Sequence, residues 1–466
     1  MGTVDPTRIR KLNDRPARRG ARYVLYWMQQ SQRAEHNDAL EHAISVANEL
    51  ELPLLTVFGL TDDYPDANLR HYRFVLEGLA DVRRALERRG IRLWVLHAHP
   101  AEAALTAGDD AAVIVCDRGY LRHQKAWRKR VASSAACAVI EVEADVVVPV
   151  DRASSRAAHA ARTIRGGLRA HWNTYLVPLD ATPLRCDALG MPNQGFELDD
   201  PYAVLEQLDI DKRVPANPRF RGGTEEAVRM LDLFLDERLQ GYAANRSQPH
   251  TDHVSHMSKY LHFGQISPVV IALNISEARA GGEDTDSFLD ELLVRRELSM
   301  NFVNFTKDYD RYACLPAWAR ETLAAHRNDP REYIYSAREL EDAKTHDPYW
   351  NAAMRELRHT GYMHNYMRMY WGKKIIEWTR APDQAFRIAL ELNNRYFIDG
   401  RDANSYANVG WVFGLHDRPW PERAIFGKVR YMAASGLERK TDPAEYVRKV
   451  ERLVREAEDA NATERR

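Results

Sequence analysis

Hydroxyl and amide side chains are clustered between Val254 and Pro268, where the sequence reads VSHMSKYLHFGQISP. Ser267 followed by Pro268 is a favourable helix start, because serine caps the first turn and proline suits its first position. Hydroxyls and backbone N–H groups at a helix start can hold the oxygens of a phosphate group. Ordinary capping of two helices explains the same residues, so the spacing leaves both interpretations open.

A second polar group lies within the aromatic run from Gly361 to Trp378. On a helix, His364 and Arg368 would share one face, and two tryptophans of the run recur seven residues apart. A core helix rarely buries an arginine beside aromatic rings without a polar partner. The run 393–404 supplies such partners, namely Asp399 and Asp402. For the tryptophans, core packing is an equally good explanation of the spacing.

Two further segments combine charges with apolar or aromatic residues. Glu291 stands four residues before Arg295, which favours a surface salt bridge of about 0.2–0.5 kcal/mol. Between Trp411 and Arg430, tryptophans alternate with basic residues, as they do on nucleic-acid-binding surfaces. Taken alone, this alternation is a weak signal.

The composition limits what these residues can do. The 466 residues include 66 Lys and Arg against 67 Asp and Glu, and this net charge of −1 excludes a uniformly basic nucleic-acid coat protein. A local basic groove is still compatible with it. The four cysteines form no CxxC pair, which argues against a disulfide framework or a cysteine-based metal site. No stretch approaches the roughly 18 apolar residues of a membrane span, so we expect a soluble, cytoplasmic protein.

The elements that must position these residues fall into two kinds. Residues 22–150 alternate apolar runs with helical periods, which predicts an α/β domain with a doubly wound parallel sheet. Ligands of such sheets bind at the C-terminal ends of the strands, where the run 26–30 contributes Gln29 and Gln30. An ordinary strand end explains this run as well. Neither GxGxxG nor GxxxxGK[ST] occurs, so the usual dinucleotide and phosphate motifs are absent. The expected strands are 23–28, 53–60, 91–98, 112–116 and 138–142, and the expected helices are 38–50, 69–89, 101–106 and 122–134.

The rest of the chain is predicted to contain three parts. Residues 1–21 are rich in arginine and are expected to form a disordered basic arm, with an organellar presequence as the alternative. Residues 151–220 lack periodicity and read as an interdomain connector. Residues 221–457 form an all-helical domain, with no internal repeat. Its expected helices are 225–239, 268–280, 287–303, 349–357, 364–379, 383–393 and 443–457.

Taken together, the motifs resemble the DNA photolyase/cryptochrome family, most closely the class II cyclobutane pyrimidine dimer (CPD) photolyases. The resemblance extends from about Tyr23 to Asp442. It implies an N-terminal antenna domain and a C-terminal domain that binds FAD, whereas composition and periodicity by themselves indicate neither FAD nor light. The matching runs are HMSKYLHFGQISP (256–268), ELLVRREL (291–298), TGYMHNYMRMYWGKKIIEW (360–378) and the segment from IDGRD to FGKVRYM (398–432).

The resemblance also implies roles for individual residues. Arg368 and Asp399 would form an ion pair beside the isoalloxazine ring, and Asn393 would face flavin N5. The other implied flavin contacts are Tyr242, Ser255, His256, Met257, Ser258, Arg295, Asn365 and Asp402. An electron-transfer chain would consist of Trp371, Trp350 and Trp378, with Tyr370 adjacent. The implied lesion pocket comprises Glu291, Arg246, Tyr366, Met369 and Trp411, and the basic rim needed for DNA is expected at Arg418, Arg423, Lys428 and Arg430.

The implied activity is that of a deoxyribodipyrimidine photo-lyase, a carbon–carbon lyase. Light would drive an electron from reduced, anionic FAD to a flipped-out CPD in UV-damaged DNA, and the protein would act as a monomer. A carboxyl at Glu291 could donate a hydrogen bond to the dimer if burial raised its pKa. Val294 replaces the tryptophan of class I relatives, and Ser247 replaces an asparagine frequent in class II.

Four points stay open at this stage. The resemblance favours 8-hydroxy-5-deazaflavin as a second, light-harvesting chromophore, although no motif specifies it. A cryptochrome-like photoreceptor would contain the same flavin without repair, but only about 24 residues follow the matched core. A (6-4) photolyase would act on a different lesion, and the class II motifs argue against it. A generic nucleotide-binding hydrolase would lack its phosphate motif.

Overall fold

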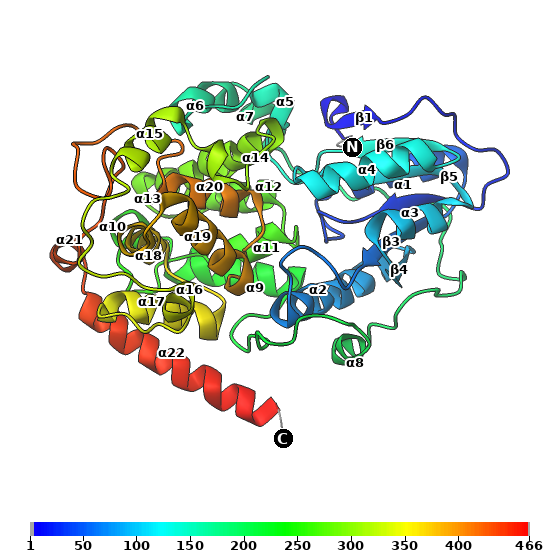
Figure 1. Ribbon diagram of the computed structural model, residues 1–466. Coiled ribbons are helices and arrows are strands. Elements are labelled where there is room, and N and C mark those ends of the chain that lie inside the picture. Colours follow the sequence, from blue (N-terminus) through cyan, green and yellow to red (C-terminus); the bar gives the residue numbers. More distant parts are fainter. Residues whose placement is uncertain (1–3, 465–466) are drawn as a thin grey trace.

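The computed structural model describes residues 4–464 and divides them into a sheet domain and a helical domain (Figure 1). The sheet has six strands in the order β1-β6-β5-β2-β3-β4, all parallel except β1. This confirms the predicted doubly wound fold. The strands are β1 (Ile9–Lys11), β2 (Tyr23–Trp27), β3 (Leu54–Leu60), β4 (Arg92–His97), β5 (Ala111–Asp117) and β6 (Ala138–Val142).

Helices cover both faces of the sheet because side chains alternate along each strand. Val24 and Tyr26 of β2 pack with the apolar sides of α1 (Asp38–Leu50) and α2 (Leu69–Glu87). Leu25 and Trp27 point to the opposite face, where α3 (Pro100–Gly108) and α4 (Arg122–Ser134) pack. Every residue of β2, β3 and β5 is buried, as expected for parallel strands that are covered on both sides.

The N-terminal arm is ordered where the sequence predicted disorder. Residues 9–11 form β1, which pairs antiparallel with the outer edge of β6. Before it, the short 3₁₀ turn η1 (Pro6–Arg8) buries the Arg8 guanidinium, which donates to the carbonyl oxygens of Glu143, Val146 and Val147. The prediction is wrong here because the pairing partner lies about 130 residues away and leaves no local signal. Residues 1–3 of the predicted arm lie outside the described residues.

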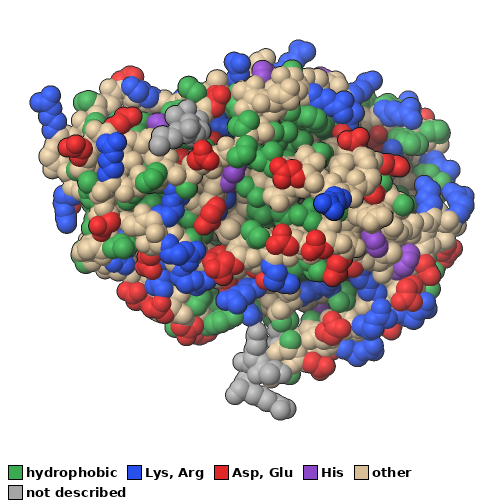
Figure 2. All heavy atoms as spheres, turned by 180° about the vertical axis from the view of Figure 1, so that it is seen from behind, with side chains coloured by type: hydrophobic (Ala, Val, Ile, Leu, Met, Phe, Trp, Pro, Cys, Tyr) green, Lys and Arg blue, Asp and Glu red, His purple; other side chains and the backbone are tan. Residues whose placement is uncertain are grey.

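The connector runs over the surface and contains only short helices. One of them, α8, packs against α2 of the sheet domain. On the face seen from behind, acidic and basic side chains are interspersed (Figure 2), in keeping with the net charge of −1. The connector helices are α5 (Val150–Ala153), α6 (Ala161–Arg169), α7 (Trp172–Tyr175) and α8 (Pro201–Glu206).

The second domain is helical, as predicted, but the expected helix 287–303 is interrupted. It divides into α13 (Gly282–Asp290), the π turn η2 (Glu291–Arg295) and α14 (Arg296–Phe305). A π turn changes the directions in which its side chains point and is frequent at functional sites. The other elements are α9 (Thr224–Glu237), α10 (Tyr242–Asn245), α11 (Ser258–His262), α12 (Pro268–Glu277), η3 (Tyr312–Cys314), α15 (Ala317–Ala325), α16 (Ala337–Glu341), α17 (Pro348–Thr360), α18 (Asn365–Trp378), α19 (Pro382–Tyr396), α20 (Ala403–Val412), α21 (Ala434–Lys440) and α22 (Pro443–Glu464).

Buried arginines fix the two domains against each other. Arg70 of α2 is 1% exposed and donates to the carbonyl oxygens of Leu357 and Tyr396 at 3.2 and 2.7 Å. Arg33, also 1% exposed, donates to the carbonyl of Gly264 at 3.0 Å. Such bonds give each guanidinium neutral partners in place of water. Among residues 4–464, no helix is long and apolar enough to cross a membrane.

Candidate functional site

The helical domain brings together three of the segments singled out from the sequence. Arg368, one turn into α18, donates from one Nη to both carboxylate oxygens of Asp399 at 3.1 Å. Burial raises the pKa of Asp399, but the Arg368 guanidinium and a hydrogen bond from Ser258 outweigh burial and hold that pKa below its ordinary value. The ion pair implied by the resemblance is therefore present and charged.

The 255–258 segment presents one buried polar atom, on His256, that has no partner among residues 4–464. Burial lowers the pKa of His256 to about 3, so its imidazole is neutral. Nε2 faces the Asp252 carboxylate at 3.3 Å, which leaves Nδ1 as a buried acceptor without a partner. The φ angle of His256 is 56°, in the left-handed region that non-glycine residues seldom adopt. A strained, half-satisfied histidine is what a binding segment for a polar ligand would contain.

Two further buried polar groups are free to bind a flavin. The Nε1 donor of Trp371 is buried without a partner, on the helix that bears Arg368. Asn393 is 5% exposed, and within residues 4–464 its side chain makes one hydrogen bond, a donation from Nδ2 to Oδ1 of Asn394 at 3.2 Å. The helical domain therefore offers an unpartnered donor, an unpartnered acceptor, a free amide and an ion pair, and these residue types fit the FAD that the resemblance implies.

Lys259 belongs to this site, although the sequence reasoning passed over it. Its side chain is 1% exposed, and its Nζ donates to the carbonyl of His256 at 3.0 Å. The ammonium also lies 3.8 Å from the centre of the Phe220 ring. Burial lowers the pKa of Lys259 to about 7. The signal was available, since this lysine stands between Ser258 and the apolar Tyr260, but lysine is a residue usually found in water.

The C-terminal helix α22 contacts the chain that leads into the same site. Lys449 is partly buried and donates from Nζ to the carbonyl oxygens of Pro249 and Thr251 at 3.3 and 2.6 Å. It also lies 3.7 Å from Asp252. One turn earlier on α22, the Tyr446 hydroxyl donates to Glu356 of α17 at 2.6 Å. The helix, which Figure 1 draws along the edge of the helical domain, therefore fixes the chain just before the 255–258 segment.

The π turn gives Glu291 a different partner from the expected one. Its carboxylate accepts from Arg246 at 2.5 Å, and Arg246 also donates to Ser287 at 2.9 Å. The salt bridge with Arg295 that the spacing alone favours does not form, because the wider turn separates the two side chains and Arg295 contacts Asp290 at 3.4 Å instead. The Glu291 side chain is 36% exposed and accepts from a guanidinium, so the burial that would make it a donor is missing.

The three tryptophans form a contiguous buried group. Trp350 donates from Nε1 to the carbonyl oxygen of Trp371 at 3.0 Å, and its ring centre lies 5.6 Å from that of Trp378. All three side chains are at most 3% exposed. Tyr370 points elsewhere, since its hydroxyl donates to Asp347.

The aromatic and basic residues 411–430 lie at the end of α20 and in the folded loop that follows it. Trp411 is partly buried, with the Lys373 ammonium 5.1 Å and the Arg430 guanidinium 5.6 Å from its ring centre. Arg430 also stacks over Trp420 at 4.2 Å and pairs with Asp417 at 3.5 Å. Three basic residues of the predicted rim are exposed, namely Arg418, Arg423 and Lys428.

The remaining predicted residues lie on the same elements, without contacts that define a role. Asn365 is exposed in the first turn of α18, and Tyr366 and Met369 are partly buried on that helix. Tyr242 is buried against Phe234 and Phe288. Asp402 caps α20 by accepting from the backbone N–H of Ala403 at 2.6 Å, and Met257 is buried.

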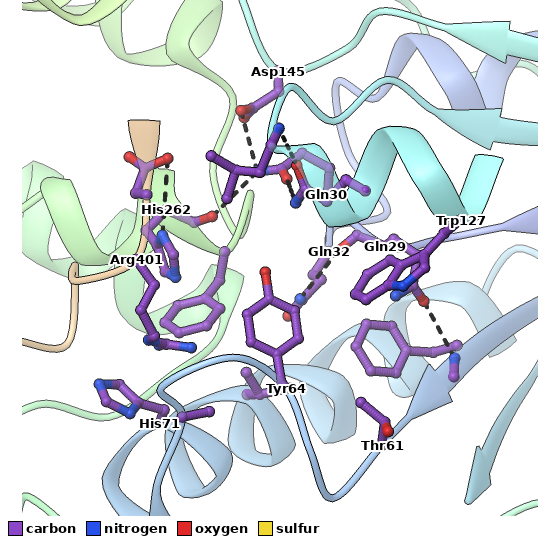
Figure 3. Close-up of a pocket in the computed structure, with 18 of the residues that line it drawn as sticks. Gln29, Gln30, Gln32, Thr61, Tyr64, His71, Trp127, Asp145, His262 and Arg401 are labelled. Atoms are coloured by element: carbon purple, nitrogen blue, oxygen red, sulfur yellow. Dashed lines mark hydrogen bonds and ion pairs between the residues drawn. The ribbon is translucent and has the colours of Figure 1, made fainter. Parts of the chain in front are cut away.

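A cavity lies between the sheet and the helical domain (Figure 3). Its empty volume is about 840 Å³, and Gln29 and Gln30 line it at the C-terminal end of β2, as the sheet rule predicted. The helical domain contributes His262 and Arg401. Arg401 is 3% exposed, with Nε and one Nη unpartnered, so a buried cation faces the cavity.

Comparison with known proteins assigns both halves of the chain. Residues 24–184 match the family model of DNA photolyase, and residues 288–462 match the FAD binding domain of DNA photolyase. The deoxyribodipyrimidine photo-lyase of Methanothermobacter thermautotrophicus is 50% identical over 97% of this chain and 100% of its own length. The deoxyribodipyrimidine photo-lyase of Arabidopsis thaliana is 37% identical over 97% of this chain and 94% of its own length.

Solved structures share the fold at lower identity. The class III photolyase from Agrobacterium tumefaciens superposes with a TM-score of 0.73 at 20% identity, covering 92% of this chain and 86% of its own. The archaeal photolyase from Sulfolobus tokodaii with two FAD molecules gives a TM-score of 0.69 at 16% identity, covering 91% and 89%.

Proposed function

This chain belongs to the DNA photolyase family, and we propose that it is a class II enzyme that uses light to repair CPDs. It is a carbon–carbon lyase that acts on pyrimidine dimers in DNA, and it is a flavoprotein that binds FAD. When reduced FAD is bound, it supplies the electron that opens the cyclobutane ring after absorbing near-UV or blue light. The observation that supports this best is that α18 contains both the cation of the buried ion pair and two tryptophans of the buried group.

The residues around the flavin hold it and balance its charge. The Arg368 guanidinium offsets the negative charge of a reduced flavin, and Asp399 fixes the orientation of that guanidinium. The Asn393 amide can present either its oxygen or its NH₂ group, so it can pair with a ring nitrogen that is protonated or not. Lys259 stands close by, and because burial lowers its pKa to about 7, a negative charge on a bound flavin would favour its protonated form.

The lesion contacts come from the Arg246–Glu291 pair and from Trp411. A pyrimidine dimer leaves the DNA stack more easily than an intact base pair, because the lesion already disturbs stacking and pairing. Glu291 would accept hydrogen bonds from base N–H groups, while Arg246 would turn to a phosphate or to a base carbonyl. The Trp411 ring would pack against the flipped dimer. Class I relatives have a tryptophan at the position of Val294, and Trp411 would take over the stacking that this tryptophan provides.

The tryptophans would keep the flavin reduced. An indole is readily oxidised, and close contact of rings allows an electron to move from one to the next. Trp378 lies 5.5 Å from Tyr335 and 5.2 Å from His346, which stand nearer the surface. We expect electrons to pass along Trp378, Trp350 and Trp371 in that order.

The interdomain cavity is the place for a light-harvesting chromophore. Aromatic and amide side chains line it, including Tyr64, Trp127 and Gln30, and these suit a flat polar ring system. The Sulfolobus tokodaii relative binds two FAD molecules, one of them described as a novel light-harvesting cofactor. For this chain the resemblance favours 8-hydroxy-5-deazaflavin. Titration of the purified protein with that compound should shift its absorbance spectrum, and Arg401→Gln should weaken the binding.

Repair of UV-irradiated oligo(dT) by reduced protein under blue light is the direct test. Recovery of thymine absorbance in the light and none in the dark is the expected result. A second oligonucleotide with a single (6-4) photoproduct should stay unrepaired.

Other outcomes would redirect the assignment. Repair of the (6-4) substrate alone would place the chain among (6-4) photolyases. A flavin-loaded protein that repairs neither lesion would favour a photoreceptor, and the roles of Glu291 and Trp411 would be withdrawn.

A further inference from the structure

The interdomain connector contains a strong local excess of positive charge. Between residues 152 and 169 there are five arginines and no acidic residue, in a chain whose charges otherwise nearly cancel. Three of these arginines lie on α6, at intervals of three and four residues, and therefore share one face. The opposite face buries Ile164 and Leu168 in the core. The arginines on that face are Arg162, Arg165 and Arg169.

Within residues 4–464 only one of the five arginines has an acidic partner. Arg165 donates to Asp290 at 2.6 Å, at the end of α13. The other four are exposed, and Arg169 lies 5.6 Å from the Trp172 ring. Exposed guanidiniums without carboxylates create a positive potential that attracts polyanions. The four exposed arginines are Arg152, Arg156, Arg162 and Arg169.

The position of α6 joins this charge to the proposed lesion pocket. The helix packs against η2. Its Arg165 pairs with Asp290, the residue immediately before Glu291. On the other side, Nδ1 of His416 lies 3.1 Å from the carbonyl of His159, which ties the connector to the loop 411–430. Seen from behind, Lys and Arg side chains gather along the upper edge of the helical domain (Figure 2), the edge at which Figure 1 draws α6 and α7.

We propose that the exposed face of α6 is a second DNA-binding element, in which Arg162 and Arg169 contact backbone phosphates beside the lesion pocket. This inference rests on the proposed function, since it takes damaged DNA as the ligand. Seven residues of helix separate the two arginines by about 10.5 Å along the axis, so their long side chains can reach different phosphates of the DNA backbone. Guanidiniums suit phosphates because their N–H groups form paired hydrogen bonds. The contact is independent of sequence and of damage.

The test is the salt dependence of DNA binding by Arg162→Gln/Arg169→Gln. Each lost phosphate contact lowers the slope of log K against log salt by about 0.9, so the slope should fall by about 1.8. The ratio of the DNA-binding constant of the unmodified protein to that of the variant should therefore fall about tenfold between 50 and 200 mM salt. The slope should fall equally for duplexes with and without a dimer, and the preference for the dimer should stay the same.

Two matched variants decide whether the effect belongs to this face. Arg162→Lys/Arg169→Lys keeps both charges and should keep most of the slope. Arg84→Gln/Arg88→Gln removes two exposed arginines at the C-terminal end of α2 in the sheet domain, one in its last turn and one just after it, and should leave the slope unchanged. The flavin spectrum and melting temperature of each variant establish that it is folded.

The outcomes separate this inference from the proposed function. An unchanged slope in Arg162→Gln/Arg169→Gln, with repair by the unmodified protein intact, overturns the α6 assignment alone. A reduced slope in a protein that neither prefers nor repairs dimers leaves α6 as a DNA contact and overturns the proposed function.

Discussion

Replacing Lys449 with methionine should weaken FAD binding without unfolding the protein. The lysine ammonium donates to two carbonyl oxygens of the chain 249–251, and no other side chain of α22 reaches those carbonyls among the described residues. Methionine keeps the apolar stem and removes the charge. A hydrogen bond that involves a charged group contributes about 1.5–3 kcal/mol. Once the lysine is gone, the two carbonyl oxygens can accept hydrogen bonds from water, which offsets part of the loss. We therefore expect the free energy of ordering this segment to become less favourable by about 2–3 kcal/mol.

That loss should appear in the affinity for FAD. If the 249–258 segment must become ordered when FAD binds, the dissociation constant should rise by about 30- to 150-fold. Reconstitution of the apoprotein with FAD, followed by flavin fluorescence, measures it. The matched control is Arg448→Met on the same helix, which removes an exposed pair with Glu445 and should leave the affinity unchanged. Equal affinities of Lys449→Met and unmodified protein, with a lower melting temperature for both apo and loaded forms, would refute the reasoning.

Three other variants test separate parts of the structure. Trp371→Phe should block photoreduction of oxidised FAD, while repair by chemically reduced protein stays within about twofold; equal loss of both would make Trp371 structural. Burial raises the pKa of Glu297 to about 8, although its carboxylate accepts from the backbone N–H of Val147. Between about pH 4.5 and 8 the folded state therefore holds a proton that the unfolded state releases, so the free energy of unfolding should fall as pH rises through this range. Glu297→Gln should remove this decline, which a plot of melting temperature against pH would show. Glu291→Gln should reduce the preference for dimer-containing over undamaged DNA by up to about tenfold, because the pair with Arg246 is half-exposed; an unchanged preference would remove Glu291 from the lesion contacts.

The elements of both domains follow from local patterns in the chain. The expected helices 38–50 and 122–134 and the strand 138–142 have the observed bounds, because helical and strand periods repeat within a few residues. Most of the flavin segment was also visible, since Ser258 and Ser267 stand at helix starts. Lys259 was missed within that segment because residue type predicts solvent exposure and says nothing of neighbours.

Other features depend on contacts between distant parts of the chain. β1 exists because the edge of β6, about 130 residues later, offers it hydrogen bonds, and a three-residue strand has no periodicity of its own. The π turn at 291–295 replaces the helical spacing, so Glu291 pairs with Arg246, 45 residues away, and not with Arg295. Hydrophobic period does not distinguish a π turn from the α-helix around it.

The sequence by itself therefore determined the two kinds of domain, their elements and the motifs of a photolyase. Apart from the Arg368–Asp399 pair that the motifs implied, the tertiary structure decided how distant charges are paired. Lys449 meets carbonyls some 200 residues earlier, and Arg165 of the connector meets Asp290 of the helical domain. The physical reason is range: propensity and periodicity act over one or two turns, whereas a charge takes whichever partner the folded chain brings within about 4 Å.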